Sequence, residues 1–174
     1  VTIDWDANAA EKAGYEHFML KEIYEQPKTI NDTISPRIKD NDIVIEELNM
    51  SDEEIKEITK IHIVACGSAY HTGVTAKYVI EGLARIPVEV DVASEFRYRD
   101  PILQKGNMVI VISQSGETAD TLAALRESRE RGFKVLGIVN VVGSSIAREA
   151  DSVMYTWAGP EIAVATTKAY SAQL

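Results

Sequence analysis

Cysteine is nearly absent from this chain of 174 residues, since Cys66 is the only one. A single cysteine excludes an intrachain disulfide and a cysteine-based metal site, and it is typical of a reducing compartment such as the cytoplasm. No apolar run approaches the roughly 18 residues that a membrane span requires. Residues 1–6 also lack the basic and apolar regions of a secretory leader. We therefore expect a soluble cytoplasmic protein with no membrane partner.

Basic clusters are missing as well. The chain has 18 lysine and arginine residues against 27 aspartate and glutamate residues, which gives a formal net charge of −9. Because proteins bind the phosphodiester backbone mainly through clustered lysine and arginine, this composition argues against nucleic acid as a partner. An anionic ligand has to be held locally, by backbone N–H groups and hydroxyls in a pocket.

The length and the 45% content of hydrophobic residues suit one buried core, and no internal repeat or low-complexity tract divides the chain. We predict a helical N-terminal arm or connector over residues 1–59 and the main domain over residues 60–174. The helical pattern at the end of the sequence has no stop signal. We therefore expect a fragment of a longer protein, with the main domain truncated at its C-terminus.

Within the arm, residues 9–34 carry an amphipathic helical pattern that Pro27 interrupts, which predicts two short helices. The charged residues 39–42 then predict a loop. Ser51 and Glu54 have the spacing of a capping box, which predicts a short helix ending near Thr59.

The main domain alternates strand-like runs with helical or polar segments. The predicted strands are residues 61–66, 88–92, 108–112, 134–139 and 152–155. The first, third and fourth are continuous apolar runs, as expected for parallel strands that are covered on both faces. We predict a doubly wound α/β fold with a parallel sheet of about five strands flanked by helices. In such a fold, ligands bind at the carboxyl ends of the strands, near the topological switch point.

The most informative segment is residues 113–118, called the hydroxyl loop below, which joins a predicted strand to a predicted helix. It contains the hydroxyls of Ser113, Ser115 and Thr118, together with Gly116. Hydroxyls, backbone N–H groups and the positive end of a helix dipole converge at such a turn, which favours an anion. The loop lacks the lysine of a nucleotide-binding P-loop. It therefore indicates a small phosphorylated metabolite as ligand.

Two further turns fall at the same predicted edge, residues 66–69 and residues 143–145. Serine and threonine are common helix N-caps, so an isolated turn of this kind needs no ligand to explain it. We interpret residues 143–145 as a helix cap only. The hydroxyl loop has more hydroxyls than one cap requires, and there we favour phosphate binding.

Four segments together match a known family. They are the turn Cys66-Gly67-Ser68 and residues 93–97 (ASEFR), 113–121 (SQSGETADT) and 159–169 (GPEIAVATTKA). In this order they resemble the SIS (sugar isomerase) domain, which implies a flavodoxin-like fold. From about His17 onward, the chain is most similar to the first of two SIS halves in the isomerase part of the glutamine–fructose-6-phosphate aminotransferase family.

The resemblance implies a hexose 6-phosphate ligand, fructose 6-phosphate or glucosamine 6-phosphate, and amino sugar biosynthesis as the role of the parent enzyme. The residues implied in ligand binding are Ser68, Ser113, Gln114, Ser115, Thr118, Val164 and Thr166. Two positions depart from the family pattern. Ala69 stands where the family commonly has serine, so no ligand contact is expected from it, and Thr166 also stands at a common serine position.

The family's catalytic groups are missing. Its isomerisation uses a glutamate base, a histidine and a lysine from sequence beyond residue 174 or from a partner subunit, and its glutaminase domain begins with a nucleophilic cysteine. We expect no catalytic residue, metal or cofactor in this fragment, with His62 in a structural role and Glu161 in a structural or interfacial role. The expected partners are the glutaminase domain, the second SIS half and a second copy in a homodimer.

Two other functions remain open at the level of the sequence. The first is a noncatalytic SIS module that senses sugar phosphates, as in some regulators. A basic recognition helix would favour it, and none is visible. The second is a phosphosugar isomerase with a single SIS domain. The arm and residues 161–168 favour the aminotransferase over this isomerase.

Overall fold

The computed structural model describes residues 11–174, and its centre is a five-stranded parallel sheet. The sheet order is β4-β3-β5-β6-β7. The strands are β3 (Lys60–Ala65), β4 (Val88–Val92), β5 (Asn107–Ser113), β6 (Lys134–Val139) and β7 (Ser152–Tyr155). The helices between and after them are α3 (Ser68–Leu83), α4 (Ala93–Tyr98), α5 (Ala119–Glu130), α6 (Ser145–Glu149) and α7 (Lys168–Gln173). The predicted doubly wound α/β fold is confirmed.

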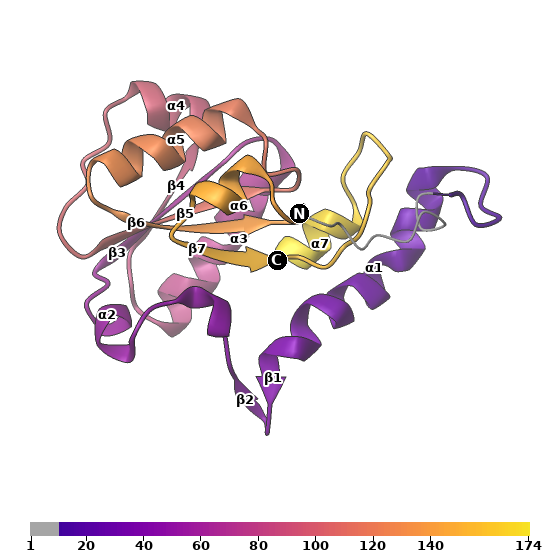
Figure 1. Cartoon of the computed structure of the whole chain (residues 1–174), viewed down its shortest axis with the longest axis horizontal. Helices are drawn as coiled ribbons and strands as arrows, with labels where there is room; N and C mark the ends of the chain where they lie inside the picture. Colours follow the sequence, from indigo (N-terminus) through magenta and orange to yellow (C-terminus); the bar gives the residue numbers. More distant parts are fainter. Residues whose placement is uncertain (1–10) are drawn as a thin grey trace.

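Side chains alternate between the two faces of the sheet, as the strand period of two requires. One face carries Val64, Val109 and Val135, which pack with Phe96 of α4 and Leu125 of α5. Figure 1 shows α4 and α5 together on this side. The other face carries the remaining strand residues, among them Ile61, Ile63, Ile112 and Leu136, and packs with Ala69 of α3. Both faces are therefore covered by helices, which explains the continuous apolar runs in the strands.

The strand order places the topological switch point between β3 and β5. From β3 the chain crosses to β4 on one side and then returns to β5 on the other, with Ala65 paired to Ile112 at the carboxyl end. The turn that follows β3 and the hydroxyl loop that follows β5 therefore start at neighbouring strand ends. This is the position at which doubly wound folds bind ligands.

The prediction of two short helices in the arm is wrong over the described residues. α1 is one helix, Phe18–Ile34, and Pro27 lies inside it. Proline has no N–H with which to bond the carbonyl of Ile23 one turn earlier. The side chain of Gln26 supplies the missing donor, because its Nε2 donates to the Ile23 carbonyl at 3.0 Å. Residues 9 and 10 of the predicted pattern lie outside the described residues.

The rest of the arm forms short elements below the sheet. They are the turn η2 (Ser35–Arg37), the antiparallel hairpin β1 (Ile38–Lys39) and β2 (Asp42–Ile43), the turn η3 (Glu46–Leu48) and α2 (Asp52–Lys56). The hairpin replaces the predicted loop. The predicted capping box is confirmed: Glu54 N donates to Ser51 Oγ at 3.2 Å, and Ser51 N donates to Glu54 Oε2 at 2.8 Å. α2 ends at Lys56, before the predicted end near Thr59.

The arm is bonded to the end of the main domain rather than separate from it. α1 packs along α7, and Figure 1 shows both beyond the carboxyl ends of β6 and β7. Thr33 Oγ1 accepts a hydrogen bond of 3.1 Å from Trp157 N, and Arg37 donates one of 3.0 Å to the Tyr155 carbonyl. In the described part of the chain, no helix combines the length and the apolar character needed to cross a lipid bilayer.

Candidate functional site

The hydroxyl loop is a compact turn held by its own hydroxyls. Ser113, the last residue of β5, is buried, and its Oγ accepts a hydrogen bond of 3.0 Å from Gly116 N. The hydroxyls of Ser113 and Thr118 share a second bond of 2.9 Å. Ser115 Oγ accepts from Glu117 N at 3.2 Å, which leaves the Ser115 hydroxyl proton available as a donor. The structure thus brings the three predicted hydroxyls into one turn.

The start of α5 adds the field of a helix to this turn. α5 has 12 residues, and Thr118 is its N-cap residue, but the Thr118 side chain makes no capping bond. The N–H groups in the first turn of the helix are therefore not bonded by the cap side chain, and the positive end of the helix dipole is directed toward the loop. Asp120 in this first turn lies 3.5 Å from Arg97, and this ion pair offsets part of its negative charge.

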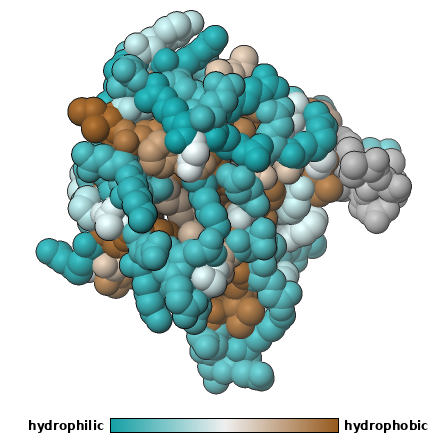
Figure 2. Space-filling view, turned by 60° about the vertical axis from the view of Figure 1, so that its left-hand side comes forward, coloured by the Kyte–Doolittle hydropathy of each residue, from teal (hydrophilic) through white to brown (hydrophobic). Residues whose placement is uncertain are grey.

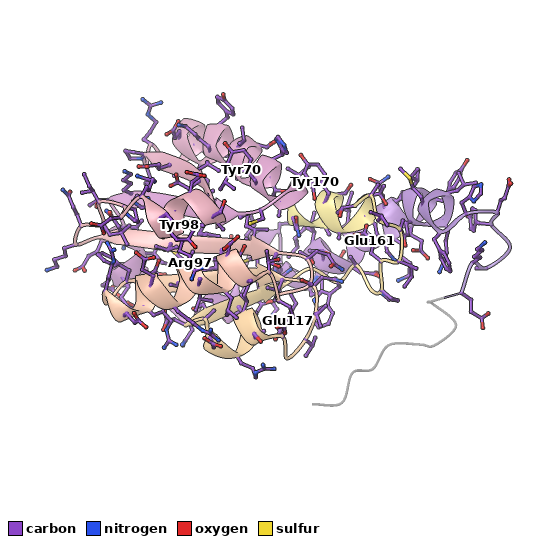
Figure 3. All side chains as sticks on the ribbon, turned by 90° about the horizontal axis from the view of Figure 1, so that it is seen from above. Tyr70, Arg97, Tyr98, Glu117, Glu161 and Tyr170 are labelled. Carbon is purple, nitrogen blue, oxygen red and sulfur yellow. The ribbon has the colours of Figure 1, made fainter. Side chains whose placement is uncertain are left out.

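The one carboxylate of the hydroxyl loop is directed elsewhere. Glu117 Oε1 accepts a hydrogen bond of 2.7 Å from Ser145 N, the first N–H of α6. Hydrogen bonds from Ser145, with a smaller contribution from the Arg148 charge, lower the pKa of Glu117. Glu117 is labelled in Figure 3. Its negative charge is thus bound by the neighbouring helix rather than left free to repel an anion.

This contact also corrects our interpretation of residues 143–145. Ser144 is the N-cap residue of α6, yet its side chain makes no capping bond. The Ser144 Oγ is instead buried and has no hydrogen-bond partner within the described part of the chain, and the acceptor at the start of α6 is Glu117. A carboxylate is a favourable acceptor at a helix N-terminus because it interacts with the positive end of the dipole.

Ser68 lies on the adjacent turn after β3. Gly67, with φ +59°, is the N-cap residue of α3, and Ser68 is exposed at the start of that helix. Thr121 Oγ1 of α5 lies 3.8 Å from Cys66 Sγ, which joins this turn to the start of α5. Ala69 is buried against the core, so the residue that departs from the family pattern is turned away from the exposed edge.

Asn140, at the end of β6, connects the hydroxyl loop to the segment after β7. Its backbone N–H donates to the Gln114 carbonyl at 3.1 Å, and its Nδ2 donates to the Gly159 carbonyl at 2.8 Å. Its Oδ1 accepts from Ala158 N at 2.9 Å. Asn140 is 3% exposed, so these bonds are shielded from water. Our sequence analysis missed this residue, although a polar residue directly after a buried strand was the available signal.

Residues 159–167, called the C-terminal loop below, carry Val164 and Thr166. Glu161 Oε1 accepts hydrogen bonds from Thr167 N at 2.9 Å and Ala169 N at 3.2 Å, so Glu161 closes the loop onto α7. Figure 3 shows Glu161 beside α7. Val164 is fully exposed and Thr166 is half-buried. The structure therefore puts these two residues on a separate loop, which Asn140 connects to the hydroxyl loop.

An apolar cavity of 290 Å³ lies elsewhere, between α1, β7 and α7. Its lining includes Ile30, Ile34, Met154 and Leu174 but no residue of the hydroxyl loop. Figure 2 shows hydrophobic side chains gathered near the lower end of the molecule. The lining is mostly apolar and does not suit a phosphate, so the hydroxyl loop stays the candidate site for an anion.

A cluster of possible metal ligands lies at the β4 edge of the sheet. His62, Glu89 and Asp91 bring ligand atoms within 4.8 Å of one another. Lys60 bonds Glu89 at 2.6 Å, however, and Arg99 bonds Asp91 at 3.1 Å. Each carboxylate is already paired with a cation, and a metal ion would have to displace these partners. We therefore assign the cluster to the stability of the fold.

Comparisons with known proteins agree with the fold and with the family resemblance. A sequence model of the SIS domain family matches residues 54–174. The glutamine–fructose-6-phosphate aminotransferases (isomerizing) of Clostridium acetobutylicum and Caldanaerobacter subterraneus are 66% and 64% identical to the chain over 173 residues. Each alignment covers 99% of this chain and 28% of the relative, so the chain spans little more than a quarter of their length.

A solved structure supports the same assignment. The C-terminal domain of glucosamine-fructose-6-phosphate aminotransferase from Francisella tularensis superposes with a TM-score of 0.89 and 47% identity. The match covers 94% of this chain and 46% of that domain. The chain therefore belongs to the SIS domain family, as a segment that aligns with the glutamine–fructose-6-phosphate aminotransferases.

Proposed function

We propose that the hydroxyl loop binds the phosphate group of fructose 6-phosphate or glucosamine 6-phosphate. The observation that carries this proposal is the geometry of the loop itself. Three hydroxyls and the uncapped N-terminus of α5 meet at the carboxyl end of β5 beside the switch point. Hydrogen bonds to a charged group contribute roughly 1.5–3 kcal/mol each, and a helix terminus about 0.3–1 kcal/mol.

The chain is, in this proposal, the first SIS half of a longer enzyme that makes glucosamine 6-phosphate from fructose 6-phosphate and glutamine. Relatives named glutamine–fructose-6-phosphate aminotransferase (isomerizing) support this proposal, because their alignments cover nearly the whole of this chain. The glutaminase domain and the second SIS half would supply the catalytic groups, and a second copy would complete a homodimer. The share of the reaction assigned to this chain is phosphate binding, with Ser68, Val164 and Thr166 directed to the rest of the ligand.

The experiment that tests this proposal is calorimetric titration of the purified chain with glucosamine 6-phosphate. Ser115→Ala removes a hydroxyl donor. Ser113 is a less suitable position for this substitution, because its hydroxyl also holds the turn together. We expect Ser115→Ala to weaken binding about tenfold or more. Ser35→Ala is the matched control, because its exposed hydroxyl bonds Asn31 in the arm, outside the hydroxyl loop. Equal affinities of the wild type and Ser115→Ala would refute the assignment.

A further inference from the structure

Glu22 is an acidic residue of the arm that is buried against the C-terminal loop. It lies in α1 and is 2% exposed. Its Oε1 accepts hydrogen bonds from Ile162 N at 2.6 Å and from Ala163 N at 3.1 Å. These residues are separated from Glu22 by 140 and 141 positions in the sequence. A carboxylate from the arm thus fixes the backbone directly before Val164.

The C-terminal loop is held at two points with an exposed tip between them. Glu22 holds its first part, and Glu161 holds its end through Thr167 N and Ala169 N. The side chain of Val164, between these points, is fully exposed. Charge-assisted bonds are roughly twice as strong as neutral ones, so two carboxylates fix the path of the loop although Val164 at its tip is fully exposed.

The neighbouring residues of α1 contact the same region. Glu25 bonds Lys168 Nζ at 2.7 Å, and Gln26 bonds Ser171 Oγ. Residues 22, 25 and 26 lie on one face of a helix because their spacing is three and four. One face of α1 therefore contacts the C-terminal loop and α7 together, while the second carboxylate oxygen of Glu22 is buried and has no hydrogen-bond partner among residues 11–174. Burying this oxygen without a hydrogen bond costs free energy, and an apolar side chain could pack at this position without that cost.

We propose that Glu22 is a positioning residue for the sugar part of the ligand: it holds the C-terminal loop so that Val164 and Thr166 are presented beside a hexose whose phosphate occupies the hydroxyl loop. This inference rests on the proposed function. It makes the arm a part of the ligand site, although the arm lies more than a hundred residues away in the sequence. Glu22 acts through the loop backbone and need not touch the ligand.

The test compares two ligands, fructose 6-phosphate and inorganic phosphate, by calorimetry on the 174-residue chain. Glu22→Ala removes the acceptor, and Glu22→Gln keeps a neutral one. Thr33→Val is the matched control, since Thr33 also joins α1 to the domain, through Trp157 N, but does not contact the C-terminal loop. Hydrogen exchange of residues 159–167 without ligand gives an independent measure of the anchoring and remains informative for Glu22→Gln if Glu22→Ala does not fold.

We expect Glu22→Ala to weaken the affinity for fructose 6-phosphate about tenfold and to leave the affinity for inorganic phosphate within about twofold of the wild-type value. Glu22→Gln should lie between Glu22→Ala and the wild type, with faster exchange at the amides of Ile162 and Ala163, and Thr33→Val should match the wild type for both ligands. Unchanged sugar-phosphate binding, equal losses for both ligands or unchanged exchange would overturn the inference. A wild type that binds neither ligand would instead overturn the proposed function, and the inference with it.

Discussion

Gly116 of the hydroxyl loop and Ser144 before α6 pack so closely that a Cβ atom on Gly116 would lie 2.1 Å from Ser144 Oγ. Gly116 also has a φ of +67°, a conformation that residues with a side chain rarely adopt. Its carbonyl accepts a hydrogen bond of 3.0 Å from Ile146 N. The two turns after β5 and β6 are therefore built against each other, and the glycine is required by both space and backbone geometry.

Gly116→Ala should destabilise the chain by about 2–5 kcal/mol, because overpacking costs about 1–3 kcal/mol and the left-handed conformation about 1–2 kcal/mol more. Urea unfolding monitored by circular dichroism measures this loss. Gly132→Ala is the control, since Gly132 has a φ of +83° with open space around it. Gly132→Ala should lose only the stability that the left-handed conformation costs. Equal losses of stability for the two variants would show that the contact with Ser144 does not matter.

Stability should also depend on the protonation of His62. This side chain is 1% exposed, and burial, with a smaller effect of the Lys60 charge, lowers its pKa. The unfolded chain takes up this proton near pH 6.5 while the folded chain resists it, so stability is present above about pH 6.5 and falls as the pH decreases below it. The chain should therefore be less stable at about pH 5.5 than at about pH 7.5.

The measurement is urea unfolding of the wild type and His62→Gln at these two pH values. His62→Gln removes the titrating group, so its stability should change less with pH, whatever its absolute stability. The carboxylates with lowered pKa values, such as Glu54 and Glu89, titrate below this window and do not confuse the result. Identical pH dependence in both proteins would rule out His62 as the cause.

The chain by itself should neither isomerise fructose 6-phosphate nor hydrolyse glutamine. Glu161 is the acidic residue closest in sequence to Val164 and Thr166, and its Oε1 is occupied by the backbone N–H groups of Thr167 in the C-terminal loop and Ala169 in α7. A general base has to reach the proton that it removes within about 3 Å. A coupled assay for hexose-phosphate isomerisation, repeated with Glu161→Gln, checks this. Turnover that disappears in the variant would make the chain a self-sufficient isomerase.

The sequence predicted the parts of the fold that depend on local pattern. All five strands lie within one residue of their predicted bounds, since continuous β-branched runs between turns leave few alternatives. The three hydroxyls of the hydroxyl loop were also found, because they are contiguous with a strand end. Their role in phosphate binding stays a prediction, as do the roles of Ser68, Val164 and Thr166.

What the sequence could not predict depends on contacts between distant segments. Pro27 indicated a helix break, but Gln26 restores a donor to the Ile23 carbonyl and α1 continues. The burial of Glu22 requires backbone N–H groups from the C-terminal loop, which no local pattern reveals. Asn140 likewise acts on two loops that only the sheet order brings together. The boundary between arm and main domain near residue 59 stays a prediction.

The claim at the centre of this account is that recognition begins with the phosphate. The most direct test is a competition experiment in which glucose 6-phosphate and unphosphorylated fructose displace bound fructose 6-phosphate from the purified chain. We expect the strongest donors of the chain to converge on the phosphate, so glucose 6-phosphate should compete nearly as well as fructose 6-phosphate, and fructose should not compete. Fructose that competes comparably with its 6-phosphate would contradict binding led by the hydroxyl loop.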